Sequence, residues 1–485
     1  MTKAALVIGL AAFAAGWTVM LLQLLGGRLM APAFGQTIHQ WGALIGTTLT
    51  FMTLGYWLGG RLGSGRHAER LLPGLLAIGA FWAALTPWLG RALSAQAEAL
   101  LGPTAGALAA SAILLGPPSL ALAAVSPLCV ARLARQGAVA ASSGAVSALG
   151  AMGSIGGTFF GAFLAVPLLG LTGGYASAAV LAAAAAMATG IRPRHAVLLL
   201  LPVLPAAGAQ RDFNAGFVEV METPYNTILV ADTPEALLLS INTPSVVQSL
   251  RRRDGGPTGQ YWDSLAAAPA LAQGQSVLQG QSVLFLGAAG GSAIEATARA
   301  WPGLRALGVE IDPGITDIAR RRFGLTVPVV TADARRFVDA STALFDVVVI
   351  DLYATGQIPA HVATREFYQA VSRRLAPGGV VALNVYGAGQ PDLILAPIVA
   401  TLASVFAGLL SAEIDEGNTI LFAWNSEVTL SEARNRLSIA PVGVADRLLA
   451  ALAEPSPSWL SGPILTDNRS DLDLRAARAL AARAR

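Results

Sequence analysis

Cysteine and charge are both scarce in this chain of 485 residues. The single cysteine, Cys129, excludes an intrachain disulfide framework, so packing and hydrogen bonds must hold the fold together. Only 13% of the residues are charged, whereas 54% are hydrophobic, and this balance is too apolar for an ordinary soluble protein. We therefore expect part of the chain to lie in a membrane, and its length predicts more than one domain.

Histidine is also rare. The four histidines, His39, His67, His195 and His361, are widely spaced and have no partners at metal-ligand spacing, so the sequence predicts no zinc or iron site. The sequence also lacks a Ser-His-Asp arrangement and a phosphate-binding lysine loop. Hydrolase and kinase functions therefore find no support.

Acidic residues are nearly absent from the first 210 residues, which contain two Glu and no Asp against ten Lys or Arg, a net charge of +8. The rest of the chain has a net charge of −5, so the sequence pI of 9.3 describes neither half. The basic excess flanks apolar segments, which indicates membrane orientation rather than a nucleic acid partner. The lipid bilayer is the partner that we expect for this half.

Six apolar stretches in the first half are long enough to cross a bilayer. Eight basic residues fall on one side of a six-span arrangement and only Arg28 and Arg91 on the other, which places the N-terminus and residue 195 onward in the cytoplasm. A seventh stretch, 196–209, is short for a span and contains Pro202 and Pro205, so we expect it to be interfacial or re-entrant. If it crossed, the second half would be exported. The six expected spans are 4–25, 41–60, 71–89, 105–130, 146–169 and 174–191.

The pattern changes after residue 210. Short strand-like runs between residues 217 and 241, separated by turn residues, predict a small β-hairpin region. From Tyr261 onward, strand and helix patterns alternate, which predicts a parallel sheet with helices on both faces. The expected parts are a transmembrane helical domain of six or seven spans at 1–210, a small β-strand region at 211–260 and an α/β domain at 261–485.

A glycine-rich loop follows the first expected strand of the α/β domain, in the sequence VLFLGAAGGS at 283–292. Three acidic residues, Glu310, Asp333 and Asp351, end later strands. Because the carboxyl ends of parallel strands meet at one edge of a sheet, these residues and Gly287 predict a nucleotide-type cofactor site. Glu310 suits the ribose hydroxyls, Asp333 an adenine amino group and Asp351 the reacting centre. Each acidic residue taken singly fits a helix cap or a turn equally well.

The loop lacks the spaced G-x-G-x-x-G of a dinucleotide dehydrogenase, and the order of acidic residues resembles that of S-adenosylmethionine-type transferases. The VEID sequence at Glu310, the Tyr261-Trp262-Asp263 helix start and the segments TPYNTILV and LTDNRSDLD look like the spermidine synthase family of aminopropyltransferases. RLMAPAFG followed by GYWLGGRL is similar to bacterial membrane proteins that fuse several spans to a spermidine synthase-like domain. The resemblance covers nearly the whole chain. It implies a multi-span helical domain in the bacterial inner membrane, fused to a Rossmann-like transferase domain.

The resemblance also implies an activity, the transfer of an aminopropyl group from decarboxylated S-adenosylmethionine to an amine or polyamine, with release of methylthioadenosine. By position, Asp351 would orient and deprotonate the attacking amine, with Tyr261 as its hydroxyl partner. Gly287 and Gly291 would shape the cofactor loop. No metal is required, and the oligomers formed by soluble family members make a homodimer the expected assembly.

Three departures from the family pattern leave the reaction open. The family usually has an aspartate at Gly290, a glutamine at Trp262 and a second aspartate at Ala354, and each change removes a polar partner of the donor or of a diamine. Trp262 and Tyr353 would instead form an aromatic wall that binds a cation or apolar groups. Intact S-adenosylmethionine as donor, and therefore methyl or other alkyl transfer to an amine or a lipid-borne substrate, is one alternative. A polyamine transporter or sensor with a non-catalytic binding domain is another.

Overall fold

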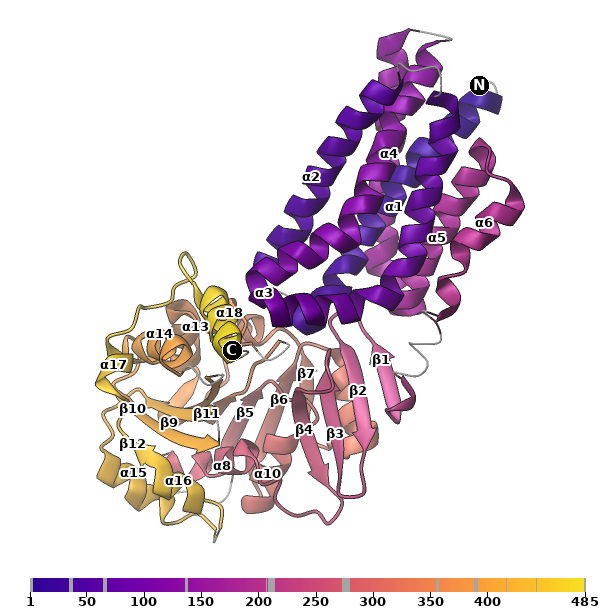
Figure 1. Cartoon of the computed structure of the whole chain (residues 1–485). Helices are drawn as coiled ribbons and strands as arrows, with labels where there is room; N and C mark the ends of the chain where they lie inside the picture. The colour runs from indigo at the N-terminus through magenta and orange to yellow at the C-terminus, as the bar shows by residue number, and fades with distance from the viewer. Residues whose placement is uncertain are drawn as a thin grey trace. The chain divides into compact units, whose positions relative to one another are not determined.

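The computed structural model of the chain contains two compact units (Figure 1). One unit comprises Met1–Gly216 with Glu222–Pro224, and the other comprises Phe217–Met221 with Tyr225–Arg485. We call them the helical unit and the sheet unit. The structure describes residues 3–34, 38–63, 68–135, 138–205, 207, 214–272, 280–354, 357–387, 391–415, 417–441 and 443–483.

The helical unit consists of long apolar helices. Among the described residues, four helical stretches are long and apolar enough to cross a membrane, and these are Ala5–Phe34, Arg70–Gly102, Thr104–Ala134 and Val139–Thr189. The last stretch would measure about 75 Å if straight, more than twice a hydrocarbon core, and it is broken at Gly170, where φ is +65°. The helices are α1 (Lys3–Phe34), α2 (Ile38–Gly63), α3 (Ala68–Ala134), α4 (Val139–Phe160), the π-helix η1 (Gly161–Leu169), α5 (Gly170–Thr189) and α6 (Pro193–Leu200).

Five of the six expected spans fall within helices, and the sixth, 174–191, runs two residues past the end of α5 at Thr189. Helix α2, which contains 41–60, is not among the four candidate stretches. The coarse expectation of several apolar helices is confirmed. The number that crosses a membrane stays a prediction.

Helices α1 and α4 pack closely because glycines face backbone across their contact. A Cβ atom at Gly153 would lie 2.0 Å from the Phe13 carbonyl oxygen, and one at Gly157 would lie 2.3 Å from that of Trp17. Neither position has room for a methyl group. This is the small-residue packing by which helices associate in lipid, where no hydrophobic effect drives them together.

The sheet unit contains a small antiparallel sheet of four strands in the order β1-β2-β3-β4. The hairpin of β2 and β3 was expected, whereas β4 was not anticipated. The apolar face of β2 and β3 packs against a helix and a π-helix of the same unit, α11 (Pro313–Ile318) and η2 (Ala319–Phe323), through side chains such as Val230 and Phe323. The strands are β1 (Glu219–Glu222), β2 (Thr227–Asp232), β3 (Ala236–Ile241) and β4 (Val247–Arg252).

The larger sheet has eight strands in the order β12-β10-β11-β9-β8-β5-β6-β7. Strands β5 to β9 pair with one another in parallel, as expected, but β10, β11 and β12 are antiparallel to their neighbours and were not anticipated. The strands are β5 (Ser282–Leu286), β6 (Arg305–Glu310), β7 (Val329–Thr331), β8 (Phe345–Ile350), β9 (Leu375–Tyr386), β10 (Gly408–Asp415), β11 (Asn418–Trp424) and β12 (Leu452–Ala453).

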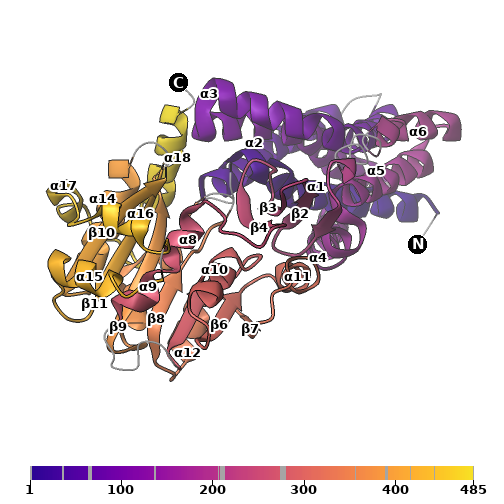
Figure 2. The same ribbon diagram turned by 90° about the horizontal axis from the view of Figure 1, so that it is seen from below.

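Both faces of this sheet are covered, which explains why its central strands contain long apolar runs such as Val283–Leu286 in β5 and Val347–Ile350 in β8. Val283 and Phe285 of β5 face one layer of helices, and Leu284 and Leu286 face the other. Figure 2 shows the two helical layers from below. The first layer contains α8 (Tyr261–Leu265), α9 (Ala268–Leu271), α10 (Ser292–Ala300), α15 (Leu430–Leu437) and α16 (Asp446–Ala451), and the second contains α12 (Ala334–Ala340), α13 (Arg365–Ser372), α14 (Pro391–Ala403), α17 (Pro457–Leu460) and α18 (Leu472–Arg483).

The strand order reverses at β5. The chain runs from β5 outward through β6 to β7 and then returns to form β8 on the other side of β5. Ligands of such sheets bind outside the carboxyl ends of the strands at this switch point. The ends of β5 and β8 are therefore the place to look for a site.

We predict that Gly153→Ala lowers the thermal stability of the protein in detergent, because the new methyl group would overlap the Phe13 carbonyl and force α1 and α4 apart. Overpacking of this kind costs about 1–3 kcal/mol. Gly150→Ala is the matched control in the same helix, since its Cβ would lie 3.8 Å from the nearest carbonyl oxygen, an ordinary contact. Equal melting temperatures for the two variants would contradict the close packing of these helices.

Candidate active site

The glycine-rich loop brings the ends of β5 and β8 into direct contact. Gly287 has a φ of +92°, and a Cβ at this position would lie 2.2 Å from the backbone oxygen of Asp351. Gly291, at the start of α10, also has a left-handed conformation, with a φ of +93°. A residue with a side chain would be strained at both positions and would have no room at Gly287. The loop therefore owes its path to these two glycines.

Glu310, at the end of β6, is 7% exposed and holds the same loop. One carboxylate oxygen accepts a hydrogen bond from the Ala289 N–H at 2.9 Å, and the other accepts one from the Asp312 N–H at 3.1 Å. Burial raises the pKa of Glu310, and these backbone hydrogen bonds oppose the shift. Each oxygen can accept a further bond, so the role expected at the ribose stays a prediction.

Asp351 lies at the end of β8 and accepts hydrogen bonds from three side chains. The Tyr261 hydroxyl donates at 2.9 Å to one carboxylate oxygen, and the Asn384 amide donates at 3.0 Å to the other. The Trp262 side chain is the third donor. Burial raises the pKa of Asp351 despite these donors. Burial and the Asp351 charge together raise the pKa of Tyr261, so that its hydroxyl stays protonated and donates.

The two residues expected as an aromatic wall are both engaged within the protein. Trp262 is 3% exposed, packs in the hydrophobic cluster on one face of the sheet and lies 4.9 Å from Tyr261 between ring centroids. The Tyr353 hydroxyl donates to the Asn384 carbonyl at 3.1 Å and accepts from the Tyr386 N–H at 2.7 Å. Their role in substrate binding stays a prediction.

The sequence analysis missed Asn384, which β9 places beside Asp351. It is 1% exposed, and its side-chain oxygen has no partner among the described residues. The signal was present, because a single amide interrupts the apolar run VVALNV shortly before the strand ends. A buried polar group in a central strand needs a partner, and here that partner is the carboxylate of Asp351.

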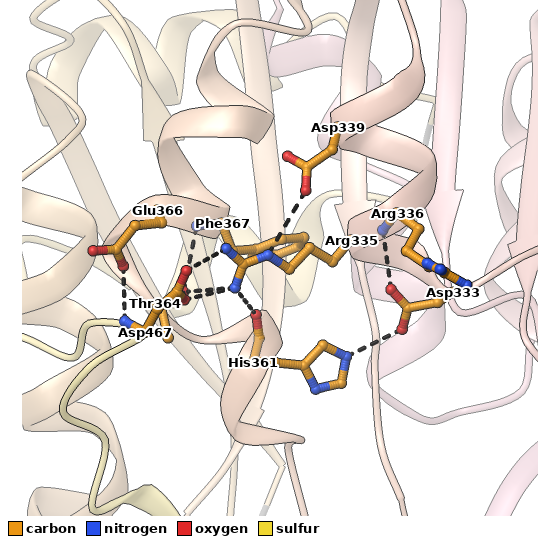
Figure 3. Close-up of polar contacts among 9 residues, drawn as sticks. All are labelled: Asp333, Arg335, Arg336, Asp339, His361, Thr364, Glu366, Phe367 and Asp467. Atoms are coloured by element: carbon orange, nitrogen blue, oxygen red, sulfur yellow. Dashed lines mark hydrogen bonds and ion pairs between the residues drawn. The ribbon is translucent and has the colours of Figure 1, made fainter.

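Asp333 caps α12, the structural role that the sequence left open. One carboxylate oxygen accepts from the Arg336 N–H at 3.0 Å, and the other lies 3.1 Å from Nε2 of His361 (Figure 3). Burial raises its pKa, but the hydrogen bonds from Arg336 and His361 outweigh burial and leave the pKa below its ordinary value. The expected contact with adenine is compatible with this cap and stays a prediction.

An ion pair at Arg335 connects this edge to the C-terminal part of the chain. Arg335 and Asp467 form a two-pronged contact, and Arg335 also donates to the His361 carbonyl at 3.0 Å (Figure 3). The Thr364 hydroxyl donates to Asp467 at 2.8 Å, and the Asp467 N–H donates to Glu366 at 3.0 Å. The segment that connects β8 to α13 begins at Asp351 and ends at Thr364. Asp467 therefore holds the end of this segment that lies next to α13.

Strand β4 packs directly against Gly290, the position at which the spermidine synthase family usually has an aspartate. The Gly290 N–H donates to the Ser249 hydroxyl at 2.8 Å, and a Cβ at Gly290 would lie 2.7 Å from the Ser249 Cβ. The Ser292 hydroxyl accepts from the Leu250 N–H at 2.8 Å and donates to its carbonyl at 3.0 Å. The loop therefore has no room for an aspartate at this position as long as β4 is in place.

Comparisons with known proteins first define a class. Residues 283–379 match the family described as a methyltransferase domain. This match agrees with the strand order and the glycine loop and confirms the expected Rossmann-like fold of the S-adenosylmethionine-dependent transferases.

Curated relatives point to a narrower group of transferases within this class. A probable polyamine aminopropyl transferase of Bifidobacterium longum is 36% identical over 202 residues, which are 41% of this chain and 44% of the relative. The polyamine aminopropyltransferase of Vibrio vulnificus is 28% identical over 152 residues, 30% of this chain and 50% of the relative. The chain thus spans half or less of the length of these relatives. They confirm the resemblance that the sequence motifs indicate.

Among solved structures, a probable spermidine synthase from Corynebacterium glutamicum aligns with a TM-score of 0.43 and 21% identity, over 52% of this chain and 98% of that chain.

We predict that Asp467→Asn weakens the binding of methylthioadenosine about fivefold, because it breaks the charged contact with Arg335 that braces this edge of the site, a loss of about 1 kcal/mol. Isothermal titration in detergent measures the affinity. Asp471→Asn is the matched control, since it breaks a similarly exposed ion pair with Arg475 on the same C-terminal segment. If both variants bind like the parent, the Arg335 contact does not position the nucleoside site.

Proposed function

We propose that the sheet unit transfers an aminopropyl group from decarboxylated S-adenosylmethionine to an amine, and that the chain is a membrane-bound enzyme of polyamine metabolism in a bacterial inner membrane. The observation that carries this proposal is the Asp351–Tyr261 pair at the switch point of the sheet, next to the Gly287 loop. The names of the curated relatives support the same reaction.

The chemistry needs little from the protein beyond position and a base. The nitrogen lone pair of the amine attacks the carbon of the aminopropyl group that is bonded to sulfur. The new C–N bond forms while the C–S bond breaks, and sulfur keeps the bonding electrons, so neutral methylthioadenosine leaves. The proton lost by the nitrogen passes to Asp351, whose raised pKa makes it a stronger base than an ordinary aspartate.

The other site residues would bind the nucleoside. Glu310 would accept the ribose hydroxyls and Asp333 the adenine amino group, while the glycine loop lets its backbone approach the ligand. The Tyr261 hydroxyl, held on Asp351, would keep the carboxylate oriented toward the amine. These roles follow from the position of the residues at the carboxyl edge of the sheet, and substitution of each residue would test its role.

Methyl transfer from intact S-adenosylmethionine is the second candidate, and Gly290 favours it. With Ser249 against this glycine, the loop offers no carboxylate for the ammonium of the decarboxylated donor. The carboxylate of an intact donor would then meet less repulsion. The acceptor would be an amine or a lipid-borne group.

Donor choice separates the two candidates. We expect purified protein in detergent, given an amine panel, to release methylthioadenosine with the decarboxylated donor only, as measured by mass spectrometry of the nucleosides. Release of S-adenosylhomocysteine from the intact donor would replace this proposal with methyl transfer. Bound nucleoside without turnover of either donor would sink both enzyme proposals.

The pH dependence of kcat/KM tests the base. Asp351 must be ionised to take a proton, so activity should rise as pH increases through its pKa, which lies above the ordinary aspartate value. Asp351→Asn should lose about 10²-fold or more in kcat and the acid limb with it. In Tyr261→Phe the ionised carboxylate loses a donor, so its pKa rises further and the acid limb should move to higher pH.

Tyr368→Phe is the matched control for the tyrosine, because its hydroxyl is buried in the core of the same unit and has no hydrogen-bond partner among the residues that the structure describes. It should leave the acid limb in place. An unchanged profile in Tyr261→Phe would show that the hydroxyl does not act on the base.

A further inference from the structure

Helix α6 has polar side chains only in its first turn, at Arg194 and His195. From there on, residues 196–209 contain no charged side chain and none that forms hydrogen bonds, and the apolar helical stretch extends from Pro193 to Pro205. A helix that lies in the membrane interface needs one polar side toward water. Val197, Leu198 and Leu204 are instead exposed apolar side chains on the helical unit. Lipid satisfies such side chains and water does not, so α6 belongs at the depth of the bilayer.

The path of α6 runs back along α5. Leu199 packs against the cluster that contains Ala183, in the second half of α5. Val203 packs against the cluster that contains Tyr175, near the start of α5. Since α6 begins just after α5 ends, the helical stretch Pro193–Pro205 runs beside α5 in the opposite direction, from the end of α5 to the level of the cluster that contains Tyr175.

The helical unit has two ends, which its buried clusters define. Ile8 of α1 shares a cluster with Ala186 of α5, so the start of α1 and the end of α5 lie together. Leu25 of α1 shares another cluster with Tyr175, so the end of α1 lies with the start of α5. We call these the arginine-rich end and the arginine-poor end, because the basic residues divide unequally between them. Among the described residues, Lys3, Arg61, Arg70, Arg132, Arg135, Arg192 and Arg194 belong to the first by their places in the chain, and Arg28 and Arg91 belong to the second.

We propose that α6 is a seventh membrane crossing and that the sheet unit is consequently exported. The positive-inside rule places the arginine-rich end in the cytoplasm, and the chain leaves the membrane at the other end. This reverses the cytoplasmic placement expected from six spans. A helical stretch from Pro193 to Pro205 covers about 20 Å of a core of about 30 Å, a mismatch that local thinning of the bilayer accommodates.

The proposed topology does not depend on the proposed function, but it has a consequence for that function. An exported active site would draw its donor and its amine from outside the cytoplasm. A nucleoside donor made by cytoplasmic chemistry would have to cross the membrane before it could react.

Single cysteines in the full-length protein test the topology without any assay of activity. Ala343→Cys places a thiol at an exposed position of the sheet unit, and Ala138→Cys places one at an exposed position of the arginine-rich end, just before α4. The native Cys129 is buried, so the parent protein controls for background labelling. A membrane-impermeant maleimide is added to expressing cells stripped of their wall, either intact or permeabilised.

We expect Ala343→Cys to be labelled in intact cells and Ala138→Cys only after permeabilisation. Labelling of Ala343→Cys only after permeabilisation would place the sheet unit inside and overturn the proposal. Labelling of both variants in intact cells would mean that α6 does not cross, which overturns it equally. A variant that fails to fold is recognised by its elution from gel filtration and is replaced by cysteine at the neighbouring exposed residue, Thr342 or Val139.

Discussion

The contact between Gly287 and the backbone of Asp351 is the constraint on which the site depends. Parallel strands β5 and β8 are neighbours, and the loop after β5 must pass over the end of β8 without a side chain between them. The left-handed conformation of Gly287 turns the loop, Glu310 accepts a hydrogen bond from the loop N–H of Ala289, and Ser249 of β4 accepts one from the N–H of Gly290. The carboxylate of Asp351 therefore lies beside a loop that these contacts hold in place.

The electrostatics of the site set burial against hydrogen bonding. A buried carboxylate loses its hydration, which favours the protonated form, whereas each donor favours the ionised form. Tyr261, Trp262 and Asn384 supply those donors, but burial prevails and the pKa of Asp351 is raised. Its raised pKa makes the carboxylate a stronger base than an ordinary aspartate, and the donors hold it in one orientation. Asp333 shows the opposite balance, because its donors outweigh burial and its pKa is lowered.

The helical unit is packed differently, because the backbones of its helices approach each other closely. Glycines on α4 meet carbonyl groups of α1, and the few basic residues collect at one end. Under the proposed topology, the same unequal distribution would orient the bundle in the membrane. The direction of α6 would then decide on which side of the membrane the sheet unit meets its substrates.

The sequence by itself determined the order of strands and helices around the glycine loop, the apolar first half, and the positions of Gly287, Glu310, Asp333 and Asp351 at strand ends, because local periodicity and chain order encode these features. It did not reveal Asn384 as a partner of Asp351, the Arg335–Asp467 contact across 132 positions, or the antiparallel strands β10 to β12. Each depends on which distant segments become neighbours. The sequence left α6 ambiguous for the same reason: its length and prolines describe a short helix, and only its packing along α5 gives it a direction. Tertiary structure also decided that Gly290 has no room for a side chain, since the atom that fills the space belongs to β4, about forty residues away in the chain.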